Sequence, residues 1–596
     1  MVHRGPDDQG LCVDPHSGLS LSARRLSVID LDRGHQPLHS EDGAVWAVLN
    51  GEIYNHASLR SQLERKGHRF ASATDTEVLV HLYEEYGVEL VHALEGMYAF
   101  AVWDRRRREL LLARDRFGEK PLFYTQLGDG HLAFASELTA LRAGVGCALE
   151  IDPGSLDAFF VLGCVPGERT IFEGVRQLPP ASILRWSMDV RERDVRSYWT
   201  MPRRPASRAD SVSDLALEAG ELLAASVRSR LAADVPVGVF LSGGLDSALV
   251  AALAAQQVSG RLRTFTVDYD TGAVGEARRA RATAEQIGSD HSEVILSSGE
   301  ISERVGMVMR ALDQPNADPA LIALHAVAQE ARRTVTVAVG GEGADELFGG
   351  YPRYRWMRRA DRAARLLPSG LAAAGAQVIA SAVPGRAGKL AEVIRPLSLA
   401  QRQLEWVTGG RRQAREELYG PRMQHTLARD LVLEDVEGVL SACGRDGPVD
   451  ALMALDRARY LPDDVLAKAD RATMLVSLEM RTPYLSRELA ELTAAIPTAT
   501  HLRGGGKALL RQVARSLPAL SGADRAKRAF AVPMAQWLRG PLLGALQEAA
   551  DGPLVSDGWI DGAALRRRMQ AHAMGSSDQS AILWPLLVMG LWMGAL

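Results

Sequence analysis

Residues 242–247, with the sequence SGGLDS, combine residue types that can hold a polyanion. They follow the apolar, valine-rich run 235–241 and precede an alanine-rich run with helical character. Two glycines allow a close backbone approach, the serines can donate hydrogen bonds, and the following helix N-terminus adds partial positive charge. The pattern predicts a phosphate-binding turn, and the alternative is an ordinary strand-to-helix turn capped by a serine.

Asp246 is the unusual member of this turn, because a carboxylate beside phosphates repels them unless a cation lies between. A divalent metal, Mg²⁺, is therefore predicted there. A second acidic turn, residues 340–346 (GGEGADE), follows the strand-like run TVTVAV. Because ligands bind at the carboxyl ends of parallel strands, Asp345 is expected opposite Asp246 as a second metal ligand, with Glu342 facing the substrate. A solvated acidic loop is the alternative.

The SGGxDS pattern resembles the PP-loop of ATP pyrophosphatases, which release pyrophosphate while adenylating an acyl or similar oxygen. It differs from the G-x-x-x-x-G-K-[ST] loop, which has no acid at this place. The difference decides which phosphate bond is broken.

Two regions of different texture position these turns. Residues 1–200 contain short apolar runs rich in Val, Phe, Tyr and Trp, typical of strands. Residues 201–214 contain Pro, Ser and mixed charge, which favours a linker. From 215 onward strands alternate with helices, which predicts a doubly wound parallel sheet, and beyond about 355 the chain is mostly helical. The predicted class is α/β, with domains at 1–200 and 215–596.

The overall composition is that of a globular protein with no basic field. The 596 residues carry a net charge of −4, with 47% hydrophobic and 24% charged residues, so neither nucleic acid nor an acidic membrane is an expected partner. Four cysteines without a CxxC pair, and no apparent secretory signal, favour the cytoplasm. The apolar C-terminal run is shorter than the roughly 20 residues of a membrane span and contains Pro585, so a buried helix is predicted.

Many strings together resemble the glutamine-dependent asparagine synthetase family. In the second region they are GVFLSGGLDSALVAALA, GEGADELFGGYPRY, YLPDDVLAKADRATMLVSLEMRTPYLS and RAKRAFAVPMAQWL. In the first region they include HRGPDDQG, RLSVIDL, GHQPL, LNGEIYNH, TDTEVL, MYAFAVWD and RDRFGEKPLFY. The resemblance implies an N-terminal glutamine amidotransferase domain, an antiparallel α+β sandwich of N-terminal-nucleophile type, followed by a PP-loop synthetase domain.

For the synthetase domain, the resemblance implies MgATP-dependent adenylation of the aspartate side chain, followed by amide formation with ammonia. The implied ATP-binding residues are Leu241, Ser242, Gly243, Gly244, Asp246, Ser247, Val267, Gly340 and Gly341. Asp246 and Asp345 would bind Mg²⁺, and Glu342 would position the acceptor or act as a base. Lys468 would neutralise the charge that develops on the acyl-adenylate and pyrophosphate.

For the amidotransferase domain, the resemblance implies that glutamine is hydrolysed and that ammonia passes through an internal tunnel. The implied glutamine-binding residues are Arg25, Asn50, Gly51, Glu52 and Asp75. Arg25 would hold the carboxylate of glutamine, Asn50 and Gly51 would form an oxyanion hole, and Asp75 would bind the amine. A type I′ hairpin turn is the structural alternative for Asn50-Gly51.

The sequence departs from the family at its start. Family members carry an N-terminal cysteine nucleophile whose own α-amine acts as base, whereas residue 2 here is Val, and the strand that bears the cysteine is absent. Cys12 lies inside a predicted strand and has no adjacent α-amine, so it cannot substitute. Either translation starts upstream at a Met-Cys, or the chain uses free ammonia or another amine. As printed, it is expected to lack glutaminase activity and to expose a strand edge.

Three functions remain open. The first is asparagine synthesis from aspartate, ATP and glutamine or ammonia. The second is an amide or lactam ligase of specialised metabolism, because β-lactam synthetases and lasso-peptide cyclases resemble this family. Gly340, Ser486 and Ala529 stand where the family usually has other residues, which leaves the acceptor acid open. The third is a non-catalytic binding module, which the intact motifs disfavour. A homodimer is the assembly that the resemblance implies.

Overall fold

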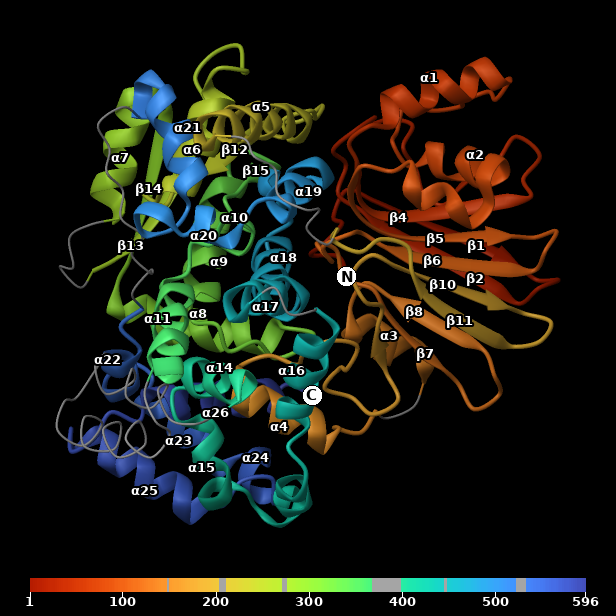
Figure 1. The fold of residues 1–596 in the computed structure, drawn as a ribbon. Helices are drawn as coiled ribbons and strands as arrows, with labels where there is room; N and C mark the ends of the chain where they lie inside the picture. The colour runs from red at the N-terminus through yellow and green to blue at the C-terminus, as the bar shows by residue number, and fades with distance from the viewer. Residues whose placement is uncertain (147–148, 203–210, 271–275, 367–397, 444–446, 521–531) are drawn as a thin grey trace.

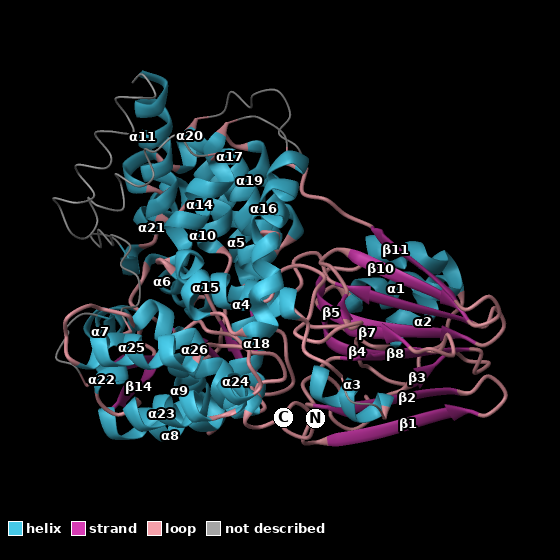
Figure 2. Cartoon of the chain, turned by 90° about the horizontal axis from the view of Figure 1, so that it is seen from below, coloured by secondary structure: helices cyan, strands magenta, loops and turns pink. Residues whose placement is uncertain are grey.

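The computed structural model describes residues 1–146, 149–202, 211–270, 276–366, 398–443, 447–520 and 532–596. Two lobes lie side by side, one formed by the N-terminal strands and the other by the parallel sheet with its helices (Figure 1). The view from below shows the same division, and in both views the chain ends lie close together between the lobes (Figure 2). Most of the predicted linker lies outside the described residues.

The N-terminal lobe is built on antiparallel sheets. A six-stranded sheet runs in the order β11-β10-β6-β5-β4-β3 (Glu192–Ser197, Ser182–Ser187, Glu109–Arg114, Gly96–Asp104, Val45–Ile53 and Leu38–His39). Smaller sheets pair β1 with β2 (Asp8–Asp14 and Leu19–Arg25) and order β8-β7-β9 (Leu132–Ala135, Phe123–Gln126 and Arg176–Gln177). The helical segments are α1, α2, η1, α3 and α4 (His56–Lys66, Glu77–Tyr86, Gly87–His92, Leu138–Val145 and Pro153–Leu162).

The alternation of side chains along β5 explains how this sheet is covered. Tyr98, Phe100 and Val102 pack with the apolar residues of α1 and α2. Ala99 and Trp103 face the other way and pack with residues of β2, β7 and β10. Because successive side chains point to opposite faces, one strand contributes to two cores.

The C-terminal lobe contains a five-stranded parallel sheet in the order β14-β13-β12-β15-β16 (Asp290–Leu296, Arg263–Tyr269, Val237–Phe240, Val337–Val339 and Glu479–Arg481). Helices α5 to α9 accompany it (Val212–Arg230, Leu245–Ala255, Glu276–Ile287, Ser298–Ala311 and Ala320–Arg332). The strand order reverses between β12 and β15, and ligands bind at such a switch point in open α/β sheets. The predicted α/β class, with antiparallel sheets before a parallel one, is confirmed.

The helical extension follows β15. Its first α-helices are α10, α11 and α14 to α19 (Ala344–Phe348, Pro352–Leu366, Leu399–Thr408, Arg411–Leu418, Leu431–Ala442, Pro448–Leu455, Ala467–Met474 and Arg487–Ala495). The later helices are α20 to α26 (Thr498–His501, Ala508–Ser516, Met534–Arg539, Leu543–Asp551, Pro553–Ser556, Gly562–Ala573 and Ser580–Met593). The interposed segments are η2 to η6 (Pro421–Ala428, Asp456–Leu466, Pro483–Leu485, Arg503–Gly505 and Pro518–Leu520), of which η3 is a π-helix.

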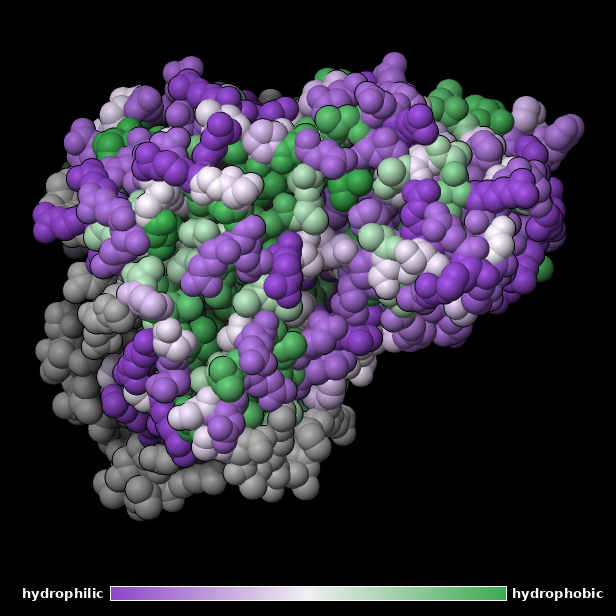
Figure 3. All heavy atoms as spheres, turned by 90° about the horizontal axis from the view of Figure 1, so that it is seen from above, coloured by the Kyte–Doolittle hydropathy of each residue, from purple (hydrophilic) through white to green (hydrophobic). Residues whose placement is uncertain are grey.

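The C-terminal helix α26 is buried, as its apolar sequence predicts. Trp584 and Trp592 donate their indole N–H groups to the carbonyl oxygens of Ala317 and Leu312, at 2.8 and 2.9 Å. In the described part of the chain, no helix has the length and apolar character needed to span a bilayer. On the face drawn in Figure 3, hydrophilic side chains cover most of the surface and hydrophobic ones form scattered patches.

Strand β1 pairs with β2 alone among the described strands, so one of its edges is unpaired. Leu11 and Val13 are 66% and 56% exposed. Cys12 between them is partly buried and packs against the core that contains Trp103. Burial raises the pKa of the Cys12 thiol, so the thiolate needed for nucleophilic attack is disfavoured.

Buried charged groups join the two lobes. Arg4 of the N-terminal lobe donates to both carboxylate oxygens of Asp470 on α18, at 2.7 and 3.0 Å, and Lys120 reaches the same carboxylate at 3.3 Å. Burial alone would raise the pKa of Asp470, but the charges of Arg4 and Lys120 outweigh it and lower that pKa to about 2. A second link joins Glu52 to Arg481 at 2.9 Å. The lobes are therefore held by specific, buried ionic contacts.

Candidate active site

The turn between β12 and α6 has the backbone shape that a phosphate cradle needs. Gly243 lies in the left-handed region at φ 66°, and a Cβ there would sit 2.6 Å from the carbonyl oxygen of Glu276. The hydroxyl of Ser247 accepts from the backbone N–H of Ser242 at 3.1 Å, and the two hydroxyl oxygens are also 3.1 Å apart. The two serines thus present adjacent hydroxyls beside the N-terminus of α6.

Asp246 and Asp345 converge on one cation, the ammonium of Lys507. Its nitrogen lies 2.5 Å from Asp246 Oδ2 and 2.5 Å from Asp345 Oδ1. Burial disfavours the charge of Lys507, but the two carboxylates outweigh it and raise its pKa above the ordinary value. Gly350 makes this approach possible, because a Cβ there would lie 1.7 Å from Asp345 Oδ1.

Sequence reasoning missed Lys507. The signal that could have found it is the run of residues 504–507, GGGK. All three glycines have positive φ, and Lys507 itself lies in the left-handed region at φ 53°. A glycine-rich loop that ends in a lysine is a pattern typical of anion-binding loops.

Lys468, at the start of α18, is largely buried, with 13% of its side chain exposed, and forms an ion pair. Its ammonium lies 2.5 Å from Asp318 Oδ2 in the loop before α9. Burial opposes its charge, but Asp318 and Asp464 raise the pKa of Lys468 above the ordinary value. Lys468 is therefore a permanent cation, and Asp318 is a second residue that the sequence did not single out.

Glu342 lies in the same region with an oxygen, Oε2, that has no hydrogen-bond partner among the described residues. Burial raises the pKa of Glu342, the charge of Asp246 adds to that effect, and Lys468 opposes it. A carboxyl group with a raised pKa is a stronger base than a free carboxylate, which suits a general base or acid.

One cavity of about 600 Å³ gathers these groups at the carboxyl edge of the parallel sheet. Every predicted synthetase residue except Gly340 lines it: Leu241, Ser242, Gly243, Gly244, Asp246, Ser247, Val267, Gly341, Glu342, Asp345 and Lys468. Gly340 lies directly behind, where a Cβ would come within 2.3 Å of Glu342 Oε2. Arg279, Arg353 and Arg511 add further positive charge to the walls.

A second cavity, of about 320 Å³, lies in the N-terminal lobe. All five predicted glutamine-binding residues line it: Arg25, Asn50, Gly51, Glu52 and Asp75. One guanidinium nitrogen of Arg25, Nη2, donates to the carbonyl oxygens of Ile29 and Asp30 at 2.5 and 2.9 Å. The other, Nη1, has no partner among the described residues and can bind a carboxylate.

Asn50 and Gly51 do not form a hairpin turn. They lie within strand β4 and pair with Ala99 and Tyr98 of β5. Gly51 has φ 136°, and a Cβ there would lie 2.0 Å from the carbonyl oxygen of Met97, so only glycine fits. The amide nitrogen of Asn50 is buried without a hydrogen-bond partner among the described residues, which suits a donor reserved for a ligand.

Asp75 and Glu52 are held by neighbours outside the cavity. Asp75 accepts a hydrogen bond from the backbone N–H of Ile53 at 2.8 Å. Glu52 contacts Arg481, which is fully buried on β16 and also pairs with Glu479 at 2.8 Å. Burial, and then the charge of Asp75, raise the pKa of Glu52 well above its ordinary value. The wall of this cavity therefore depends on an arginine of the other lobe.

Comparison with known proteins adds a family to this geometry. A family model described as asparagine synthase matches residues 218–594, and one described as glutamine amidotransferase domain matches residues 1–199. The chain belongs to the glutamine-dependent asparagine synthetase family.

Named relatives cover almost the whole chain. Glutamine-hydrolysing asparagine synthetase 1 of Bacillus subtilis is 32% identical over 99% of this chain and 92% of its own length. A Mycobacterium bovis protein provisionally given the same activity is 38% identical over the same shares. A Gibberella zeae protein named amidase chry2 is 27% identical over 94% of this chain and 88% of its own.

Of the residues that depart from the family pattern, Ser486 has a local structural role. Ser486, where the family usually has Asp, caps α19 by accepting a hydrogen bond from the backbone N–H of Leu489 at 3.3 Å. Serine and aspartate are both good N-caps, so this position is structural here. Ala529 lies outside the described residues.

Proposed function

We propose that this protein makes asparagine: it adenylates the side-chain carboxylate of aspartate with ATP and then forms an amide with ammonia, which is either derived from glutamine or supplied free. The observation that carries the proposal is the cavity at the switch point, which combines a phosphate-type turn, two converging carboxylates and a buried lysine. Family membership supports the same activity, because members are named glutamine-hydrolysing asparagine synthetases.

The residues of this cavity have separable roles in the proposed reaction. The hydroxyls of Ser242 and Ser247, with the N–H groups at the start of α6, hold pyrophosphate, while Leu241 and Val267 frame the nucleoside. Lys468 keeps its charge because Asp318 and Asp464 raise its pKa. It therefore stabilises the negative charge that develops as the bond between the α- and β-phosphates breaks.

Asp246 and Asp345 suit a magnesium ion as second cofactor. Two carboxylates that already converge on one ammonium can converge on one hard divalent cation, for which oxygen donors are preferred. When bound, Mg²⁺ supplies neutralisation of the phosphate charge. Lys507 then shares the same pair of carboxylates and brings a second positive charge to the phosphates.

Glu342 is placed to serve the second half of the reaction. Its raised pKa lets it take a proton from the incoming amine once the acyl-adenylate has formed. In the other lobe, Arg25 and Asp75 bind the two ends of glutamine. Asn50 and Gly51 are placed at its side-chain amide, where they would form an oxyanion hole if a nucleophile attacked that amide.

The test is pyrophosphate release with candidate acids and nitrogen donors. Aspartate should stimulate release and yield asparagine, with ammonium chloride as one donor and glutamine as the other. Release only with a peptide or a β-amino acid would instead indicate an amide or lactam ligase, and no release with any acid would indicate a binding module. The implied homodimer is checked separately, by sedimentation of the full chain.

A further inference from the structure

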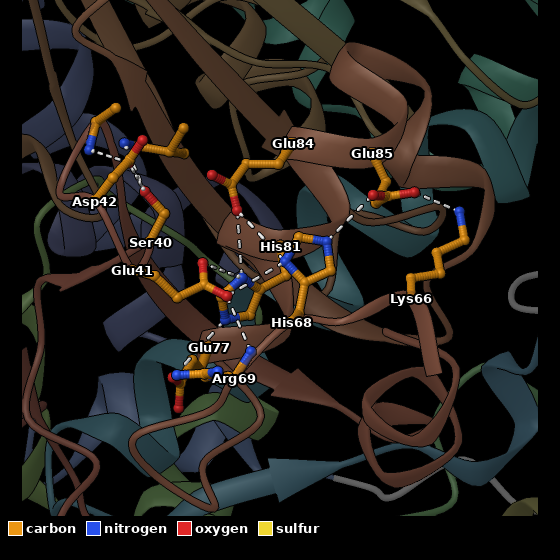
Figure 4. A network of polar contacts seen from close by, with 12 residues as sticks. Ser40, Glu41, Asp42, Lys66, His68, Arg69, Glu77, His81, Glu84 and Glu85 are labelled. Atoms are coloured by element: carbon orange, nitrogen blue, oxygen red, sulfur yellow. Dashed lines mark hydrogen bonds and ion pairs between the residues drawn. The ribbon is translucent and has the colours of Figure 1, made fainter. Parts of the chain in front are cut away.

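Four side chains of the N-terminal lobe converge away from both cavities. They are Glu41 in the loop between β3 and β4, His68 after α1, and His81 and Glu84 on α2. Figure 4 shows their polar ends turned toward one another, and one donor atom from each lies within 4.8 Å of all the others. We call these residues the histidine–glutamate cluster.

We propose that the histidine–glutamate cluster is a tetrahedral binding site for Zn²⁺, or for a divalent transition metal of similar size. Two imidazoles with two carboxylates are a donor set suited to such a metal, whereas Mg²⁺ and Ca²⁺ prefer oxygen alone. A structural role is expected, because four protein ligands would leave no open position for a substrate.

The distances between the donor atoms agree with this geometry. With metal–ligand bonds of roughly 2.0–2.1 Å, neighbouring ligands of a tetrahedral ion lie about 3.4 Å apart. His81 Nδ1 lies 3.4 Å from Glu41 and 3.3 Å from Glu84, and His68 Nδ1 lies 3.5 Å and 3.7 Å from the same two residues. Both imidazoles therefore already lie near the tetrahedral separation from Glu84 Oε2, and each lies at a similar distance from one of the two carboxylate oxygens of Glu41.

Sequence spacing explains why α2 supplies two of the four donors. His81 and Glu84 are three residues apart, so both lie on one face of the helix. His81 is 1% exposed and its ring packs edge-on against Phe70, which fixes its orientation. His81 is thus a buried imidazole in a fixed orientation, with two carboxylates near its Nδ1. Such a group can bind a metal ion without first having to be ordered.

The outer nitrogens of both histidines face further carboxylates. His68 Nε2 lies within hydrogen-bonding distance of Glu85, at 3.2 Å, and Glu85 also pairs with Lys66. His81 Nε2 faces Glu77 at 3.8 Å, too far for a hydrogen bond, and has no hydrogen-bond partner among the described residues. Metal-bound histidines usually direct their second nitrogen to a carboxylate, which fixes the tautomer that leaves the inner nitrogen free to bind. Both histidines thus present Nδ1 inward and Nε2 outward.

The first experiment measures zinc retained by the full chain after incubation with ZnCl₂ and desalting. The wild type should retain one more zinc per chain than His68→Gln/Glu84→Gln. Any zinc bound at Asp246 and Asp345 is the same in both proteins and does not affect this difference. The matched control is His92→Gln/Glu89→Gln, which removes an exposed histidine–glutamate pair 3.1 Å apart and should retain wild-type zinc. Equal zinc in wild type and cluster variant would overturn the proposal, and the cluster would then be only a set of histidine–glutamate contacts.

The second experiment uses the wild-type chain and does not depend on whether the cluster variant folds. Wild-type chain titrated with CoCl₂ should develop the intense visible bands of tetrahedral Co²⁺ at one equivalent, and ZnCl₂ should abolish them. Glu85→Gln, which alters only the outer shell, should weaken zinc binding by about 10- to 100-fold. Weak octahedral bands in the wild type, or no bands, would rule out the tetrahedral site.

Discussion

The two cavities differ in where their charged residues find partners. In the synthetase cavity the partners lie inside the cavity itself: Lys468 pairs with Asp318, and Lys507 pairs with Asp246 and Asp345. Opposite charges that face one another in this way can exchange partners when a polyanion with its metal arrives. The ion pairs are thus a preformed electrostatic environment for the reaction.

In the glutamine cavity the charged groups are held by backbone groups and by the other lobe rather than by opposite charges within the cavity. Arg25 donates to backbone carbonyls, Asp75 accepts from the backbone of β4, and Glu52 contacts Arg481 across the lobe boundary. This arrangement fixes the shape of the cavity and ties it to the other lobe. Substitutions at the boundary should therefore act on stability, whereas substitutions in the synthetase cavity should act on chemistry.

The largest effect is expected from Arg481→Met at the boundary. It leaves Glu52 and Glu479 buried without their cation, which costs roughly 3–5 kcal/mol. Calorimetry of the full chain should show a lower thermal midpoint, and Glu52→Gln/Arg481→Met should recover part of it. Arg185→Met is the matched control, because Arg185 pairs with Glu109 on the exposed surface, where a salt bridge contributes less than about 1 kcal/mol. Equal shifts in both variants would remove the distinction drawn between boundary and surface.

The next effect is catalytic. Lys468→Met should lower aspartate-dependent pyrophosphate formation by about 10²- to 10³-fold, because a preformed cation at the reacting phosphates is lost. The thermal midpoint should fall less than in Arg481→Met, because Asp318 lines the cavity and is more exposed than the partners of Arg481. Lys66→Met, at an exposed lysine, is the control and should keep wild-type turnover. Unchanged turnover in Lys468→Met would end the case for this cavity as the adenylation site.

A smaller effect is expected from Gly350→Ala. The new Cβ would lie 1.7 Å from Asp345 Oδ1 and 2.1 Å from Lys507 Cε, so both groups must shift. A misplacement of about 1 Å can cost on the order of 100-fold in rate, and the Mg²⁺ concentration needed for half-maximal activity should rise. Gly544→Ala adds a methyl group in open space and is the control. If Gly350→Ala keeps the wild-type rate and the wild-type Mg²⁺ concentration for half-maximal activity, the proximity of Asp345 and Lys507 has no role in the reaction.

Much of this architecture follows from local sequence signals. Alternating strand and helix patterns predict β12 to β15 with α6 and α7, and the glycines mark the two turns at the switch point. Strand β16 was missed because three residues carry no periodicity, and it exists only through parallel pairing with β15. The hairpin alternative for Asn50-Gly51 is wrong because β5 pairs with both residues, a contact that local sequence does not encode.

The site shows the same limit. The predicted residues line two cavities, and their roles stay predictions. Lys507 and Asp318 were missed because each is defined by a partner far away in the sequence: Asp246 is 261 positions from Lys507, and Lys468 is 150 positions from Asp318. A lysine or an aspartate read in isolation is usually a surface residue. Only the tertiary contacts of Lys507 and Asp318 show that each forms an ion pair inside the cavity.

The smallest effect concerns pH at the lobe boundary. Glu119 is buried and accepts a hydrogen bond from the Thr482 hydroxyl of the other lobe. Burial, and then the charge of Asp115, raise the pKa of Glu119 to about 8. Because the unfolded value is about 4.3, the folded chain holds this proton more tightly. Its contribution to stability is fully present below the unfolded pKa and is lost as pH rises through about 8.

Glu119→Gln keeps an acceptor for Thr482 but cannot ionise, so its thermal midpoint should fall less than that of the wild type between pH 5 and pH 8. The slope that the variant loses is at most about 1.4 kcal/mol per pH unit. Glu488→Gln, at an exposed residue, should follow the wild-type profile. Parallel profiles for wild type and Glu119→Gln would mean that the boundary accommodates an ionised Glu119. In that case the lobe boundary would adjust to a new charge as the synthetase cavity does, and the contrast between the two regions would fail.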